Sequence, residues 1–239
     1  MKIILIRRVA LLVSLMLAFT GVVLAQEGQR SRMENEIKRS NNAARVFGQI
    51  MRIPEKAIPE TVLDGAECVA VFPSVRKAAF IFGGRWGNGV ATCRTGRGWS
   101  APIYLEIRGG SFGWQIGAQS TDFVLLFMNQ EGLDSLLSSK FTLGGEASVA
   151  GGPVGRTAAA STDIKVRSQI LSYSRTRGVF AGLSLKGVVV SPDDKAMERV
   201  YGEEATAREI LQENRLAAPR SVRAFPNRLA RYSSRLAER

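Results

Sequence analysis

Basic side chains set between glycines are the residues of this chain whose types best suit binding chemistry. Arg85 precedes Trp86 within the run GGRWGNG, and Arg97 lies between Gly96 and Gly98. An arginine guanidinium is planar and donates paired hydrogen bonds that match the oxygens of a phosphate group. A tryptophan at a loop tip can lie at a membrane interface, because its ring is amphipathic. These residues predict a phosphate-binding surface, with a core position as the alternative for Trp86.

The same chemistry makes other basic residues of the main body candidates. Arg175 and Arg177 flank an expected turn before the last long strand, and the glycine–proline turn at 150–156 could present Arg156. Arginines that flank a turn are more often solvated charges than ligand-binding groups. The turn at 150–156 lacks a following Gly-Lys-Ser/Thr, so it is not a P-loop. The candidate binding residues of the body are Arg76, Lys77, Arg85, Trp86, Arg97, Arg156, Arg175 and Arg177.

The composition argues against catalysis. The chain contains no histidine, the residue most used for proton transfer near neutral pH and the commonest metal ligand. Ser100 lies in Gly-Trp-Ser-Ala-Pro, which does not match the Gly-x-Ser-x-Gly nucleophile elbow. A hydrolase would have to use Asp122, Glu146 or Asp163, and no paired spacing supports this. We therefore expect a protein that is not an enzyme and holds no metal or cofactor.

The N-terminal residues 1–25 predict a secretory signal peptide. Three basic residues precede a nearly apolar run at 9–23, and small residues end at Ala25. These are the charged region, apolar region and cleavage site of such a peptide. A transmembrane anchor is the alternative, but the run is shorter than the ~20 residues that a span needs. We therefore expect an exported protein, located in the periplasm or outside the cell.

Two cysteines, Cys68 and Cys93, each lie in an apolar, strand-like run. The two side chains could therefore face each other in one sheet. An exported chain meets an oxidising environment, where such a pair can form a disulfide. Two buried thiols that pack as small hydrophobic side chains are the alternative.

The positive charge is concentrated at the C-terminus. The net charge is +12 for the whole chain and +9 without the three basic residues of 1–25. Residues 213–239 alone carry +5, which leaves +4 for residues 26–212. A basic tail indicates anionic partners, such as phospholipid surfaces, other polyanions or nucleic acid. Export makes nucleic acid the weakest of these candidates, so we do not expect it as a partner. The alternative is that the positive charge serves only the solubility of the chain.

The tail, residues 213–239, also has an amphipathic pattern. Its apolar residues from Val222 to Leu236 recur at spacings of 3 and 4, which places them on one helical face. A basic amphipathic helix is typical of a membrane-surface segment. A disordered tail, or a helix packed on the body, is the alternative, because Pro226 interrupts the first turn. The expected membrane-tail residues are Arg223, Phe225, Arg228, Arg231 and Arg235.

The body, residues 26–212, is predicted to form one α+β domain. Residues 31–52 carry apolar side chains at helical spacing, so we expect a helix that packs on the core or lies on a membrane. Residues 83–187 hold 19 of the 24 glycines among short apolar runs, with loops expected at 73–77 and 83–89. Glycine supplies the positive φ angles of turns and bulges. These patterns predict a curved or barrel-like sheet of short antiparallel strands covered by helices.

Five motifs occur in a fixed order. They are GWSAP at 98–102, GWQIG at 113–117, AGGPVGR at 150–156, YSRTRGVFAG at 173–182, and Tyr201-Gly202 ahead of Ile210-Leu211. On these motifs the chain resembles the SYLF domain family over roughly Met33–Gln212. The resemblance implies binding of phosphoinositides and other anionic lipids, and in eukaryotic members also association with actin. Eukaryotic members carry adaptor domains, whereas this chain has an expected signal peptide and a basic tail.

For an exported chain the resemblance implies a phospholipid ligand, and actin is not expected as a partner in that compartment. We therefore expect a non-catalytic lipid-binding module of the cell envelope. It would lie at the periphery of a membrane and bind anionic phospholipid headgroups through its basic residues. The alternative is an envelope scaffold or surface antigen that binds a protein or polyanion through its basic tail.

Overall fold

The structure is a computed structural model. It describes residues 33–54, 57–80, 82–96, 98–112, 117–153, 168–176, 185–202, 205–213 and 216–233. The chain divides into two compact units, Met1–Asn35 and Glu36–Arg239, and the sheet with its covering helices belongs to the second. Residues 1–25, the expected signal peptide, lie outside the described part.

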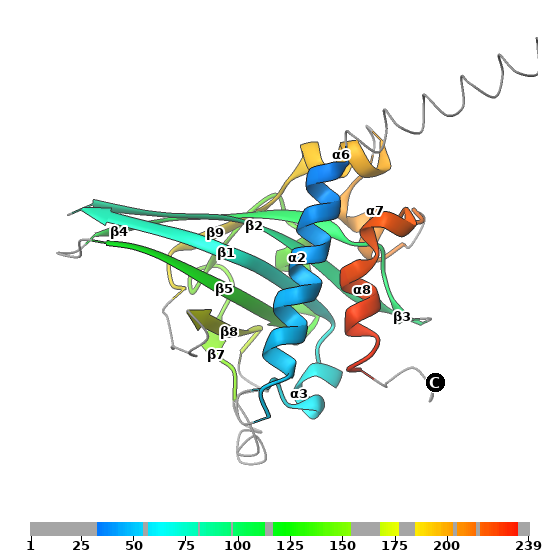
Figure 1. Cartoon of the computed structure of the whole chain (residues 1–239), viewed down its shortest axis with the longest axis horizontal. Coiled ribbons are helices and arrows are strands. Elements are labelled where there is room, and N and C mark those ends of the chain that lie inside the picture. The colour runs from blue at the N-terminus through cyan, green and yellow to red at the C-terminus, as the bar shows by residue number, and fades with distance from the viewer. Residues whose placement is uncertain are drawn as a thin grey trace, which may run out of the picture. The chain divides into compact units, whose positions relative to one another are not determined.

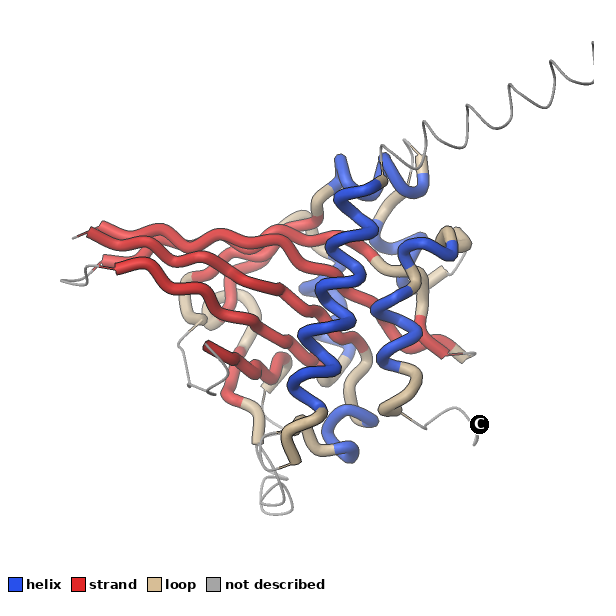
Figure 2. The backbone as a smooth tube through the Cα atoms, viewed as in Figure 1, coloured by secondary structure: helices blue, strands red, loops and turns tan. Residues whose placement is uncertain are grey.

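Figure 1 colours the helices and strands by their order in the chain, and Figure 2 distinguishes helices from strands. The helices are α2 (Glu34–Met51), α3 (Glu60–Asp64), α4 (Gln130–Leu137), α6 (Asp194–Tyr201), α7 (Ala207–Leu211) and α8 (Ala224–Leu229), with a 3-10 turn η2 (Arg220–Val222). The strands are β1 (Cys68–Phe80), β2 (Phe82–Thr95), β3 (Gly98–Trp99), β4 (Ile103–Phe112), β5 (Gly117–Phe127), β6 (Phe141–Leu143), β7 (Val149–Gly151), β8 (Ile170–Thr176) and β9 (Val188–Pro192).

The strands form one mixed sheet in the order β6-β9-β4-β2-β1-β5-β8-β7, and β3 pairs with β2. All described pairings between these strands are antiparallel except that of β7 with β8. The predicted α+β class with a helix-covered sheet is confirmed. The prediction that the strands are short is wrong for the centre of the sheet, where β1 has 13 residues and β2 has 14.

Strand β1 continues through residues 73–77, which were expected to form a loop. Val71 pairs with Val90 and Arg76 with Trp86, so β1 contains one more residue than β2 over this stretch. The extra residue forms a β-bulge at which Ser74 adopts a φ of 52°. The amide of Ser74 donates to the Asp122 carboxylate at 2.8 Å, which satisfies a group that the interrupted ladder leaves free.

The glycines at 83–89, also expected to form a turn, lie within β2. Their role there is close packing. A Cβ atom added to Gly87 would lie 2.8 Å from Cγ2 of Val75, and one added to Gly89 would overlap the ring of Phe72. Glycine in these strands therefore makes room for side chains of the neighbouring strand β1.

Helix α2 packs on the sheet. Of the two alternatives predicted for residues 31–52, packing on the core is therefore the one that the structure shows. Phe47 and Ile50 are fully buried, and the Phe47 ring lies edge-on to Phe225 with centroids 6.2 Å apart. Arg39 donates to the carbonyl of Leu105 at 2.8 Å and pairs with Asp193 at 2.6 Å. Apolar burial and these charge-assisted bonds together fix α2 across the strands.

The C-terminal segment is part of the same core, so the domain does not end at Gln212. Val222, Phe225 and Leu229 are fully buried, and Ser40 of α2 donates to the carbonyl of Val222 at 2.6 Å. The apolar face of the predicted membrane helix thus packs against α2. The expectation that Phe225 meets lipid is wrong, because α2 already covers it.

A disulfide joins Cys68 of β1 to Cys93 of β2. The two residues are direct partners in the antiparallel register, so their side chains leave the same face of the sheet. The covalent link lies at the end of the two strands where their side chains are buried.

Candidate functional site

Four strands continue past helix α2, on the side opposite α8 (Figure 1). We call this part the distal sheet and define it as residues 75–80 of β1, 82–88 of β2, 106–112 of β4 and 117–121 of β5. The part of these strands under α2 carries fully buried side chains, such as Val71 and Val124. Some side chains of the distal sheet, such as Val75 and Ile107, are buried as well. Others, such as Arg76, Trp86 and Arg108, are exposed, so a ligand can reach the sheet there.

Three large side chains form a row across the distal sheet. Trp86 pairs with Arg76 on one side and with Arg108 on the other. Directly paired residues share a face and have Cβ atoms about 5 Å apart. Among the residues that the structure describes, Trp86 is the one large hydrophobic side chain that is exposed, at 47%. The register thus places an open aromatic ring between two arginines.

This row continues the face that α2 covers. Tyr104 lies four residues before Arg108 in the regular strand β4, so the two side chains point to the same face. The guanidinium of Arg39, on α2, lies 5.0 Å from the centre of the Tyr104 ring. One face of the sheet is therefore covered at Tyr104 and open at Arg108.

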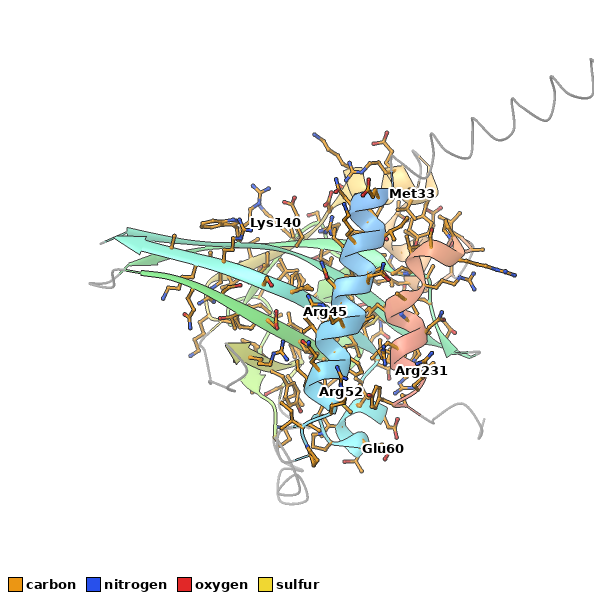
Figure 3. The ribbon with its side chains drawn as sticks, viewed as in Figure 1. Met33, Arg45, Arg52, Glu60, Lys140 and Arg231 are labelled. Carbon is orange, nitrogen blue, oxygen red and sulfur yellow. A yellow bond between two sulfur atoms is a disulfide. The ribbon has the colours of Figure 1, made fainter. Side chains whose placement is uncertain are left out.

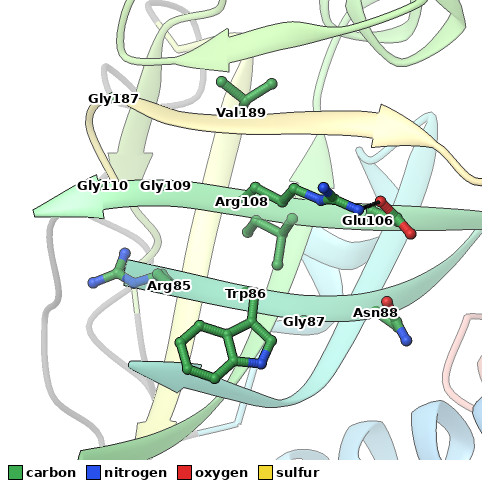
Figure 4. Close-up of a pocket in the computed structure, with 11 residues that line it drawn as sticks. Arg85, Trp86, Gly87, Asn88, Glu106, Arg108, Gly109, Gly110, Gly187 and Val189 are labelled. Carbon is green, nitrogen blue, oxygen red and sulfur yellow. Dashed lines mark hydrogen bonds and ion pairs between the residues drawn. The ribbon is translucent and has the colours of Figure 1, made fainter. Parts of the chain in front are cut away.

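Arg108 is a binding candidate that the sequence did not reveal. It pairs with Glu106 at 2.6 Å, but its side chain is 73% exposed (Figure 4). Exposed ion pairs of this kind contribute little energy, so the guanidinium can exchange its partner for a ligand. Nothing near Arg108 in the sequence marks it, since only its cross-strand position beside Trp86 gives it significance.

The neighbouring residues Lys77 and Arg85 occupy the opposite face. They pair with each other, one position along from the row. The Arg85 guanidinium lies 5.7 Å from the centre of the Phe123 ring, and partial burial lowers the pKa of Arg85. Arg85 and Trp86 were expected together at a loop tip. They instead lie on a strand and point to opposite faces, because side chains alternate along a strand.

A cavity of about 640 Å³ lies along β2 and β4 at the distal sheet. Figure 4 shows its lining, with Trp86 and Arg108 on adjacent strands and with Gly109 and Gly110 toward the end of β4. Gly84 and Gly110 pair with each other beside the row, and a Cβ on Gly84 would lie 3.7 Å from the Trp86 ring. The absence of a side chain at Gly84 thus leaves room for the ring.

Arg175 has a structural partner. It lies in β8, pairs with Asp122 of β5 at 2.8 Å and donates to Oε1 of Gln49 at 2.7 Å. Its side chain is 16% exposed. Arg175 therefore ties β8 and β5 to α2, and it is neither in a turn nor free to bind a ligand.

The remaining predicted binding residues divide into two groups. Arg223 donates to the carbonyl of Ala218 at 2.8 Å, and Arg228 and Arg231 line a groove between α8 and α2. The others lie outside the described residues, and they are Arg97, Arg156, Arg177 and Arg235.

Two of the three carboxylates that a hydrolase could use, those of Asp122 and Glu146, lie in the described part of the chain and have structural roles there. Asp122 accepts from Ser74 and Arg175, and Glu146 accepts from the amide of Thr142 at 2.7 Å. Asp163 lies outside the described residues. Within the described part of the chain, no three His, Cys, Asp or Glu side chains cluster as metal ligands. The same part contains no helix with the length and apolarity needed to cross a membrane.

The helix-covered mixed sheet, with its open row of arginine and tryptophan, defines a small α+β domain. The family model described as "Las17-binding protein actin regulator", Ysc84, matches residues 108–232. The chain belongs to this family, which confirms the SYLF resemblance.

Similar proteins come from fungi and animals. Protein YSC84 of Saccharomyces cerevisiae is 35% identical over 185 residues, which are 75% of this chain and 39% of the relative. LAS seventeen-binding protein 3 of the same species is 36% identical over 172 residues, or 70% of this chain and 37% of the relative. SH3 domain-containing YSC84-like protein 1 of Homo sapiens is 31% identical over 185 residues, or 76% and 54%. This chain thus spans between about a third and about half of these relatives. Of these three relatives, LAS seventeen-binding protein 3 has a name that describes binding.

Proposed function

We propose that this protein binds anionic phospholipid surfaces through the distal sheet, with Arg76, Trp86 and Arg108 as the contact row. The observation that carries the proposal is the exposed ring of Trp86 between two arginines in register. The indole ring can enter the interface between headgroups and acyl chains. The flanking guanidinium groups can then donate to lipid phosphates.

The expected energy is modest for each residue and depends on salt. A basic residue near an anionic lipid surface contributes on the order of 1 kcal/mol, and this attraction falls off within a Debye length. Arg76 and Arg108 together therefore give weak binding, which the Trp86 ring strengthens. Lys77 and Arg85 on the opposite face add positive potential around the same strands.

The proposal includes a location. The expected signal peptide at residues 1–25 and the basic charge of the chain support a peripheral position at a membrane of the cell envelope, in the periplasm or outside the cell. In that compartment actin is not a partner.

A second function is favoured by the family itself. The family model carries the description of a Las17-binding actin regulator, and a yeast relative is named for binding LAS seventeen. The corresponding candidate for this chain is a scaffold that binds a protein or polyanion. Such a scaffold would bind its partner without any need for anionic lipid.

Co-sedimentation of the full chain with vesicles tests the lipid proposal. We expect binding to vesicles that contain phosphatidylglycerol, weaker binding at high salt, and none to pure phosphatidylcholine. The double variant Arg76→Gln/Arg108→Gln should bind about 30-fold more weakly, since it loses two basic contacts of about 1 kcal/mol each.

The matched control is Lys140→Gln/Arg208→Gln, which removes the same charge from exposed positions outside the distal sheet. It should bind like the parent. An equal loss in both variants would mean that net charge, and not the row, governs binding. A parent chain that sediments with no vesicle would favour the scaffold function.

A further inference from the structure

A second basic site lies between helices α2 and α8. A cavity of about 410 Å³ is lined there by residues from both segments. Four of the lining side chains are arginines, and we call this site the arginine groove, defined by Arg45, Arg52, Arg228 and Arg231. Figure 3 labels three of the four, on α2 and at the end of α8.

The helical repeat aligns these residues along the groove. Arg45 and Gly48 of α2 and Arg52, the residue directly after α2, follow one another at spacings of 3 and 4, so they share a face. On the opposite wall, Arg228 and Arg231 are three residues apart. The walls come close at Gly48, where the Cδ and Nε atoms of Arg228 lie 3.5 Å from the place of a Cβ, which is an ordinary contact distance.

The two walls are held rigidly, so the groove exists before any ligand arrives. Phe47 of α2 packs edge-on against Phe225 and Tyr232, with ring centroids 6.2 and 5.8 Å apart. The buried hydroxyl of Ser40 donates to the carbonyl of Val222 and accepts from the amide of Phe225. A preformed site avoids the entropy cost of ordering its walls on binding.

The charge of the groove is uncompensated among the described residues. No carboxylate appears in its lining, and within the described part of the chain none of its four arginines forms an ion pair. Arg45 donates to Oδ1 of Asn42 and Arg52 to the carbonyl of Gly48, which leaves further N–H groups of both free to donate.

The sequence shows that this imbalance extends along both walls. There is no Asp or Glu between residues 37 and 54, or between residues 214 and 237. Arginines elsewhere in the fold do have acidic partners, as Arg39 has in Asp193 and Arg199 in Glu36. Like charges held close together destabilise a fold. An anion with several charges would relieve this repulsion.

We propose that the arginine groove binds a soluble anion that carries several phosphate groups. Guanidinium groups match phosphate oxygens in pairs, and four of them can hold more than one phosphate. The volume of about 410 Å³ suits a small molecule. The carbon-only side chains in the lining are those of Ala44 and Ala224, so the groove offers little to a membrane.

This site is separate from the proposed lipid surface. The distal sheet combines charge with the exposed Trp86 ring, whereas the groove has charge without an exposed aromatic ring. The two proposals can therefore fail independently, because vesicle binding tests the distal sheet and tripolyphosphate binding tests the groove.

Calorimetric titration of the full chain with inorganic tripolyphosphate at low salt tests the inference. We expect one binding site. The triple variant Arg45→Gln/Arg52→Gln/Arg231→Gln should lower the affinity at least about tenfold, because charge-assisted hydrogen bonds are lost. It keeps Arg228 against Gly48, and its three substituted residues are exposed, so the fold is preserved.

The control Lys140→Gln/Lys195→Gln/Arg208→Gln removes the same charge at exposed positions outside the groove and should bind tripolyphosphate normally. The groove variant should also bind phosphatidylglycerol vesicles normally. An equal loss in the control, no binding by the parent, or equal affinity for the tricarboxylate citrate would overturn the inference. Loss of vesicle binding in the groove variant would assign the groove to the membrane instead.

Discussion

Strands β1, β2, β4 and β5 each serve two purposes along their length. Under α2, their side chains are apolar and fully buried, as Val71 and Val124 are. Beyond α2, the same face carries Arg76, Trp86 and Arg108 in one row. The strands run from one region into the other, with a bulge between the two regions in β1. The proposed binding surface is thus an extension of the core and not a separate loop.

This comparison separates stability from binding. The buried half supplies most of the hydrophobic stabilisation, since burial of apolar area is the main favourable term in folding. The distal sheet is rich in glycine and open to water, so it adds mainly backbone hydrogen bonds. Substitutions in the first region should therefore change the free energy of unfolding, and substitutions in the second should change affinity.

The largest expected effect is on the core shared by α2 and α8. Phe225→Ala should lower the free energy of unfolding by about 3–5 kcal/mol, because it removes a fully buried ring. Chemical denaturation would measure the change. A loss below about 1 kcal/mol would mean that the C-terminal segment is not part of the core.

The disulfide should have the next largest effect. Cys68 and Cys93 are 25 residues apart, and a loop of this size gives about 3.5 kcal/mol in the chain-entropy model. The double variant Cys68→Ala/Cys93→Ala should therefore unfold at lower denaturant concentration. Reduction of the parent protein with a thiol should produce a similar shift. Unchanged stability in both experiments would contradict the pairing.

Trp86→Ala should act on affinity with little effect on folding. We expect vesicle binding about tenfold weaker, which corresponds to about 1.4 kcal/mol, from the loss of an interfacial ring. The free energy of unfolding should change by less than about 0.5 kcal/mol, because the ring is 47% exposed. A large loss of stability with unchanged binding would reverse the roles assigned to the two halves.

The smallest effect is expected at Gly48. Gly48→Ala should stabilise the fold by roughly 0.5–1 kcal/mol, since alanine is the better helix former and its Cβ would meet Arg228 at an ordinary contact distance of 3.5 Å. Thermal unfolding would detect the shift. A destabilised variant would show that the walls of the arginine groove cannot yield even slightly.

The sequence predicted the helices better than the strands. Apolar spacing predicted a helix at residues 31–52, and α2 spans Glu34–Met51. This signal is local. The strands were expected to break at 73–77 and 83–89, because proline and glycine usually mark turns. In this fold a bulge accommodates the first segment, and close packing explains the glycines of the second.

The site was only partly predictable for a related reason. Arg76 and Trp86 were identified from residue type, but Arg108 was not, because its importance arises from the pairing of β2 with β4. Arg175 was identified and yet is occupied by Asp122, which lies 53 residues earlier in the chain. Residue type indicates what a side chain can bind, and the register decides what it meets.

The bulge in β1 determines to which face of the sheet each later side chain of this strand points. Val71 and Arg76 are an odd number of residues apart and still share a face, because one residue is taken up between them. Deleting that residue would turn Arg76 toward Phe123 and bring Lys77 beside Trp86. The deletion of one residue would thus exchange the faces to which the basic side chains of this strand point, with no substitution of the residues that remain.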